Sequence, residues 1–173
     1  MATTTTQASG TTSPDDWTLA AGATKAAAVN QPDDDATTYL RSTTSNNTVQ
    51  TFTLTPALSS GDTITAITLT ARMSRTSQNT DFVIGYAFTP SGGGTQTGES
   101  TTQTSTATWT DFTYTHSSLS VLWGSGLTLY IKNVQAREAR ISTFYATITY
   151  TPGSGGSTQP PRTMHQMRMR IQG

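Results

Sequence analysis

The chain has no cysteine among its 173 residues. No disulfide can stabilise it, and no thiolate can bind a metal or attack a substrate. Only two histidines are present, His116 and His165, so there is little material for histidine-dependent acid–base or metal chemistry, although carboxylates remain. We expect a protein that is not an enzyme and carries no cofactor.

Charge is equally sparse. Charged residues make up 12% of the chain, and Lys+Arg balances Asp+Glu at 10 each. This zero net charge argues against a dedicated nucleic-acid binder, which carries a large positive excess. No apolar run approaches the ~18–20 residues of a membrane-spanning helix, and the first ten residues lack the basic and apolar regions of a secretion signal. We therefore expect neither nucleic acid nor membrane as a partner.

Threonine is abundant, with 40 residues against 18 serines. Its β-branched side chain favours strands over helices. Apolar and polar residues alternate with the two-residue period of strands in seven segments: 38–41, 48–54, 64–73, 82–88, 106–115, 127–134 and 140–150. Residues 23–29 are compatible with a turn of helix or a strand. The pattern predicts an all-β fold, an antiparallel β-sandwich or jelly roll with extended N- and C-terminal arms.

Composition divides the chain into four parts. Residues 1–16 have too few apolar side chains to fold alone and are expected to be a Thr-rich N-terminal arm. Residues 17–151 hold the alternating segments and are expected to form the β-sandwich domain. Residues 152–161 have the Gly, Ser and Pro content of a linker, and residues 162–173 form a basic C-terminal arm or strand.

The C-terminal arm has the periodicity of a strand, with apolar residues on one face and arginines on the other. A lone strand is unstable in water, so it needs a sheet edge on a partner; a frayed basic tail is the alternative. The expected partner-binding residues of this arm are Arg162, Met164, Met167, Arg168, Met169, Arg170 and Ile171.

The two ends of the chain have opposite charge. Residues 1–35 carry five Asp and one Lys, a net charge of −4, whereas residues 162–173 carry three Arg and no acid, a net charge of +3. Asp15 and Asp16 are therefore the expected partner-binding residues of the N-terminal arm, with head-to-tail contacts between subunits.

Asp33, Asp34 and Asp35 form the strongest cluster of hard oxygen ligands. Three consecutive side chains of an extended chain cannot all point at one ion, and the spacing of a calcium loop is absent. These residues are weak candidates for a metal site, and a solvated turn is favoured. His116 lies next to Ser117, but no acid partner or nucleophile elbow accompanies this pair, so a polar loop histidine is favoured over a hydrolase.

Trp109 and Trp123 are candidate ligand aromatics. A β-sandwich with exposed aromatic side chains can stack them against sugars, but most aromatics in this chain lie at core positions of their segments, so core packing is the default. A bound glycan would require a solvent-exposed Trp or Tyr cluster on one sheet face or loop rim.

Three stretches resemble structural proteins of tailed bacteriophages. They are Trp17–Leu19 followed by Asn30–Tyr39 (NQPDDDATTY), Thr108–Tyr114 followed by Trp123, and Ala139–Tyr150. The resemblance covers about residues 17–151, contains no catalytic motif and excludes both arms. It implies a virion component of the jelly-roll type, such as a capsid decoration protein, a head fibre or a tail appendage.

The leading hypothesis is a non-enzymatic capsid decoration (cement) protein, made in the host cytoplasm and located on the capsid surface. Its partners would be the major capsid protein or other virion proteins, and a homo-oligomer, with a trimer favoured, is implied by the resemblance. The alternative is a carbohydrate-binding module of a head fibre or tail. A hydrolase ranks last, because no nucleophile, base and oxyanion hole occur together.

Overall fold

The computed structural model describes residues 1–20, 24–30, 38–76 and 78–153. These residues form strands almost throughout, with one short helix. In chain order the elements are β1 (Ala2–Asp15), β2 (Thr18–Leu19), α1 (Lys25–Asn30), β3 (Leu40–Arg41), β4 (Thr48–Leu54), β5 (Thr63–Arg75), β6 (Thr80–Thr89), β7 (Gln96–Glu99), β8 (Gln103–Ser105), β9 (Thr110–His116), β10 (Val121–Leu122), β11 (Ser125–Asn133) and β12 (Ala139–Thr151).

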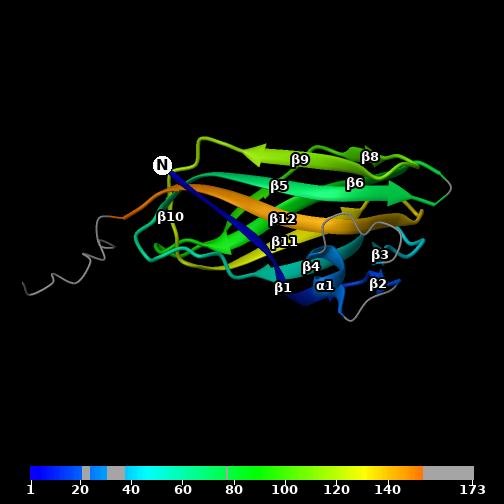
Figure 1. Ribbon diagram of the computed structural model, residues 1–173, viewed down its shortest axis with the longest axis horizontal. Helices are drawn as coiled ribbons and strands as arrows, with labels where there is room; N and C mark the ends of the chain where they lie inside the picture. Colours follow the sequence, from blue (N-terminus) through cyan, green and yellow to red (C-terminus); the bar gives the residue numbers. More distant parts are fainter. Residues whose placement is uncertain (21–23, 31–37, 77, 154–173) are drawn as a thin grey trace, which may run out of the picture.

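The strands pair into two antiparallel sheets. Sheet 1 contains β9, β5, β12 and the first half of β1, with β10 beside one end of β5 and the short pair β3 and β2 beside the other end of β12. Sheet 2 contains the second half of β1, then β4, β11 and β6, with β7 and β8 both paired to β6. Figure 1 shows β9, β5 and β12 side by side along the length of the molecule. The predicted antiparallel β-sandwich is confirmed.

Strand β1 belongs to both sheets, which corrects the expected N-terminal arm. Residues Ala2–Gln7 pair with β12, and after a shift of register between Ala8 and Gly10 the strand continues along β4. Backbone hydrogen bonds to two sheets hold this segment, so it needs few apolar side chains. Its only buried residues are Thr6 and Ala8. Figure 1 shows β1 running obliquely across the other strands.

The core lies between the sheets and follows the predicted alternation. On β5, Ile67, Leu69 and Met73 are fully buried, whereas the threonines between them face outward. The two sheets are joined by an edge-to-face pair in which Phe52 of β4 lies 5.9 Å from Phe144 of β12. Aromatic pairs of this geometry contribute about 0.5–1.5 kcal/mol beyond their buried area.

Helix α1 settles the alternative left open for residues 23–29 over the part from Lys25 onward. Its first turn is capped by Thr24, whose hydroxyl oxygen accepts a hydrogen bond from the backbone N–H of Ala27 at 3.1 Å. The helix buries Ala26, Ala28 and Val29 against β1 and β12. Tertiary packing therefore stabilises a helix that is too short to form alone.

Candidate functional site

The outer face of sheet 2 is organised around its central strand, β11. Leu129 and Ile131 point into the core and are fully buried, so the alternate residues Thr128, Tyr130 and Lys132 face outward. The four residue steps from Thr128 to Lys132 correspond to about 13 Å at 3.3–3.4 Å per residue. The outer face of sheet 2 thus carries an aromatic ring between a hydroxyl and an ammonium group.

The Tyr130 ring lies flat across the neighbouring strand. In the register of sheet 2, Tyr130 is opposite Gly85 of β6, and Gly85 is opposite Glu99 of β7. A Cβ atom at position 85 would overlap the Tyr130 ring. Glycine is therefore required at this close approach, and it lets one ring face lie against the backbone while the ring stays partly exposed.

The Tyr130 hydroxyl is fixed by Glu99. It donates a hydrogen bond to Glu99 Oε2 at 2.7 Å. Burial, together with this hydrogen bond, raises the pKa of Tyr130 above its ordinary value, so the hydroxyl stays protonated at neutral pH. Glu99 is exposed, and its second carboxylate oxygen can accept a hydrogen bond from a ligand hydroxyl.

Apart from Glu99, the surroundings of Tyr130 are small or neutral side chains and one cation. Thr51 of β4 and Gly85 flank it on either side, and the next row contains Thr128 and Ala87. Among the described residues, Lys132 forms no ion pair. This surface offers a flat apolar ring, an acceptor, a cationic donor and hydroxyls. Such a combination suits a ligand with apolar ring faces and many hydroxyl groups.

Sheet 1 carries a half-buried aromatic pair on its outer face. Trp109 precedes β9, and its ring lies 6.0 Å from that of Tyr39 in an edge-to-face arrangement. Both residues are half-buried. The sequence pattern singled out Trp109 correctly as an aromatic outside the core face of its strand.

Trp123, the other candidate ligand aromatic, belongs to the core. It is 7% exposed, and its ring packs 5.6 Å from that of Phe88. The exposed apolar residue at this place is its neighbour Leu122, at 49%. Trp123 therefore cannot serve as a sugar platform without unfolding of the surrounding core.

Asp15 and Asp16 make contacts within the chain rather than offering a free arm. Asp15 forms an ion pair with Lys25 at 2.8 Å, beside a shallow cavity of about 390 Å³ between β1 and α1. Asp16 accepts a hydrogen bond from the backbone N–H of Val49 at 2.8 Å. Both carboxylates thus stabilise the junction of β1 with its neighbours.

Several expected sites fall outside the described residues. Asp33, Asp34 and Asp35 are among them, as are all seven expected partner-binding residues of the C-terminal arm. In the described part of the chain, no cluster of three or more His, Asp or Glu residues has the arrangement of a metal site. No helix in the same part is long and apolar enough to cross a membrane.

His116 has a structural partner. Its Nδ1 atom lies 2.7 Å from the hydroxyl of the buried Tyr86. Gly98 lies beside both rings, where a Cβ atom would meet them. This arrangement fixes the imidazole against the core, and among the described residues no side-chain hydrogen bond joins it to Ser117.

Tyr130 and Glu99 were not predicted from the sequence. Residues on β11, β6 and β7 meet only through the strand register, which the alternation pattern does not provide. One signal was present: Gly85 interrupts the apolar run of 82–88, and an isolated glycine inside a strand often marks the close approach of another group.

Comparison with solved structures shows what the fold resembles, whereas no family model and no curated protein matches the sequence. The tandem CBM22-1–CBM22-2 domain of Paenibacillus barcinonensis Xyn10C is 16% identical, with 89% of this chain and 47% of that chain covered and a TM-score of 0.52. The CBM22-1–GH10 modules of Clostridium thermocellum xylanase 10B, solved with xylohexaose, are 11% identical, with 83% and 28% covered and a TM-score of 0.54.

These structural neighbours contain carbohydrate-binding modules, and the likeness shows a shared β-sandwich fold of the jelly-roll type. This chain spans about half of the tandem domain and about a quarter of the xylanase chain. Neither neighbour is a virion protein, so the resemblance to phage structural proteins is supported only for the fold.

Proposed function

We propose that this chain is a non-catalytic carbohydrate-binding module that holds a polysaccharide along the outer face of sheet 2. The observation that carries the proposal is the Tyr130 ring, which lies flat over Gly85 with its hydroxyl fixed by Glu99. A flat, partly exposed ring that is already ordered loses little conformational entropy when a sugar ring stacks on it.

The polar groups around the ring suit sugar hydroxyls. Glu99 has a free acceptor oxygen, the partly exposed Thr128 has a hydroxyl, and Lys132 has an ammonium group without an ion pair among the described residues. The outward side chains of β11 follow one line for about 13 Å. A linear polysaccharide lying along this strand would place more than one sugar unit within reach of them.

Carbohydrate binding has better support than capsid decoration. The decoration hypothesis relied on two free arms, and β1 uses the first of these to join its own two sheets. Attachment to a capsid, a trimeric state and a location on the virion stay predictions that depend on residues 162–173. Removing those residues and measuring occupancy on particles would test them.

Affinity electrophoresis of the purified chain in gels that contain soluble xylan, mixed-linkage glucan or glucomannan tests the proposal. We expect at least one polysaccharide to retard the chain, and Tyr130→Ala to weaken that binding about tenfold or more, which corresponds to about 1.4 kcal/mol. Tyr145→Ala is the matched control, because Tyr145 is half-buried on the outer face of the opposite sheet. Equal retardation of wild type and Tyr130→Ala would overturn the proposal.

A further inference from the structure

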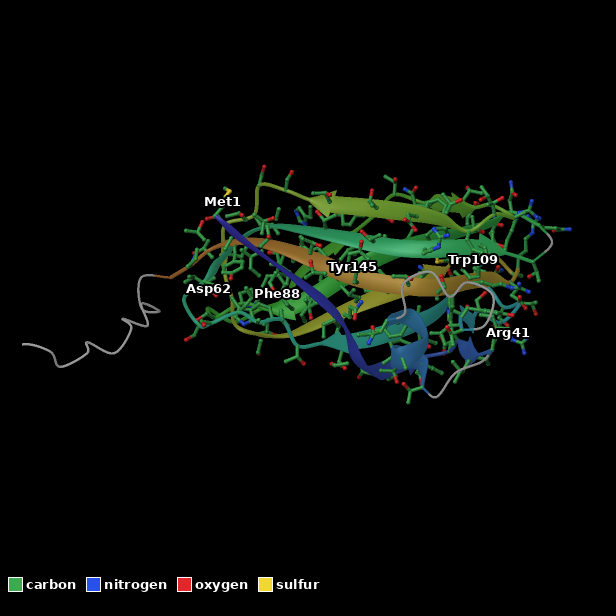
Figure 2. The ribbon with its side chains drawn as sticks, in the orientation of Figure 1. Met1, Arg41, Asp62, Phe88, Trp109 and Tyr145 are labelled. Carbon is green, nitrogen blue, oxygen red and sulfur yellow. The ribbon has the colours of Figure 1, made fainter. Side chains whose placement is uncertain are left out.

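The outer face of sheet 1 has its own cluster of aromatic and cationic side chains at one end. In the register of this sheet, Leu40 is opposite Ile141 and both point into the core, so Tyr39 and Arg41 face outward. On the other side, Thr110 is opposite Met73, so Trp109 faces outward beside Ser74. Figure 2 shows Trp109 and Arg41 toward the same end of the molecule, far from Met1 and Asp62.

Small residues lie beneath this aromatic cluster. Ser74 is on the outward side of β5, yet it is only 2% exposed. Larger side chains must therefore cover it, and Trp109 and Arg140 are its neighbours on either side in the register. The Arg140 guanidinium carbon lies 5.0 Å from the centre of the Tyr39 ring, a cation–π contact.

Two arginines lie directly opposite each other in this cluster. Arg41 of β3 is paired with Arg140 of β12, and like charges in opposed positions destabilise a sheet. Glu138 neutralises Arg140 through an ion pair of 3.0 Å. Arg41 is exposed and donates from Nε to the Thr18 hydroxyl at 3.3 Å, but no acid among the described residues pairs with it.

This excess positive charge beside half-exposed aromatic rings indicates an anionic ligand with a flat apolar face. Arginine presents two parallel N–H donors that match a carboxylate, and it binds this group better than lysine does. The aromatic edges and faces of Trp109 and Tyr39 suit the ring of a sugar. A uronic acid combines the two features, because its pyranose ring carries a carboxylate.

We propose that Trp109, Tyr39, Arg41 and Arg140 form a second binding site, on the face opposite Tyr130, for a uronic acid residue of a polysaccharide. The inference rests on the proposed function for the kind of ligand but on different residues for the site. With one site on each outer face, a single chain can hold two polysaccharide strands at once, or two parts of one strand, which raises the overall avidity.

The test uses the full chain and two forms of one polymer: a xylan with glucuronic acid side groups, and the same xylan after reduction of its carboxyl groups. Arg41→Gln is introduced into two parent chains, the wild type and the Tyr130→Ala variant. In both, we expect it to lower the affinity for the acidic xylan about tenfold and to leave the affinity for the reduced xylan unchanged. Trp109→Ala should weaken binding of both forms in the Tyr130→Ala background. Arg137→Gln is the matched control, because Arg137 is an exposed arginine that belongs to neither site, and it should leave the preference for the acidic form unchanged.

The outcomes separate the two proposals. If Arg41→Gln binds both polymers as its parent does, or if Tyr130→Ala abolishes binding to both, the second site is overturned while the site at Tyr130 stands. If Tyr130→Ala binds both polymers as tightly as wild type does, while Arg41→Gln and Trp109→Ala bind more weakly, the site at Tyr130 is overturned and the second site stands. Arg41 is exposed on a two-residue strand, so its replacement keeps the fold, which a thermal melt verifies.

Discussion

Gly85 and Tyr130 form a pair in which each residue depends on the other. The ring covers the strand backbone that glycine leaves bare, and the missing Cβ gives the ring its place. Such cross-strand pairs stabilise sheets in proportion to how well the side chains fit. The residue that orders the platform is therefore on a different strand from the residue that forms it.

Replacement of Gly85 by valine tests this pairing. Valine favours strands, so the backbone should accept it, but its side chain would displace the Tyr130 ring. We expect a loss of about 1–3 kcal/mol in the free energy of unfolding, measured by urea denaturation, and weaker polysaccharide binding. Ala87→Val, two residues along on the same face, should have a smaller effect. Equal stability and binding in Gly85→Val and wild type would contradict the ring position.

Tyr86 gives the fold a dependence on high pH. Burial raises the pKa of Tyr86 from 10.0 to about 12. A group whose pKa is higher in the folded state contributes stability that is complete below its unfolded pKa and is lost as the pH rises through its folded pKa. The free energy of unfolding should therefore fall between about pH 10 and about pH 12.

Tyr86→Phe should remove part of this fall, as measured by urea denaturation across that pH range. Tyr130→Phe should remove a further part, because the pKa of Tyr130 is raised as well. If the slopes of wild type and both variants coincide, burial of these hydroxyls does not control the alkaline stability.

Trp123 separates stability from binding. Because it packs against Phe88 in the core, Trp123→Ala should lower the free energy of unfolding by about 3–5 kcal/mol. At a temperature where the variant remains folded, its affinity for polysaccharide should equal that of wild type. A selective loss of binding with unchanged stability would place Trp123 in a ligand site instead.

At the scale of elements, β1 joins the two sheets and so holds the sandwich together. Residues of its first half pair with β12 and residues of its second half pair with β4. Each half of β1 pairs on one side only, so β1 covers the edge of β12 in sheet 1 and the edge of β4 in sheet 2. Loss of β1 would expose the edges of both β12 and β4.

Deletion of residues 1–15 should therefore abolish cooperative thermal unfolding, a cost comparable with the whole stability of a small domain, about 5–15 kcal/mol. Deletion of residues 159–173 is the control of matched length, because it removes none of the described hydrogen bonds. A chain without residues 1–15 that still unfolds cooperatively near the wild-type temperature would show that this segment is a detachable arm.

The sequence predicted the elements in which apolar side chains alternate, such as β5 with its buried Ile67 and Leu69. It did not predict β1, because a Thr-rich strand held by backbone hydrogen bonds, first to β12 and then to β4, has no apolar period to detect. It also predicted Trp109 as an outward aromatic but missed Tyr130. The difference is that Trp109 is defined by its own strand, whereas the role of Tyr130 depends on the register of three strands.

At the scale of the whole molecule, the sandwich presents two outer faces of different chemistry. On sheet 2, Tyr130 lies between the carboxylate of Glu99 and the ammonium group of Lys132. On sheet 1, outward-facing threonines of β5 and β9 are followed at one end by the arginines beside Trp109. In sheet 1, Thr68 and Thr115 lie opposite each other with their hydroxyl oxygens 3.0 Å apart. These hydroxyls satisfy one another, so the middle of sheet 1 is a poorer ligand surface than its end.

The most direct measurement is a heteronuclear NMR titration of the full chain with a soluble xylo-oligosaccharide or with another oligosaccharide that retards it in gels. We predict concentration-dependent shift changes at Tyr130, Glu99, Lys132 and Thr128, with the amides of buried β5 residues unchanged. Saturable changes confined to the loops at the ends of the sandwich, or none at any oligosaccharide concentration, would contradict a ligand on the outer face of sheet 2.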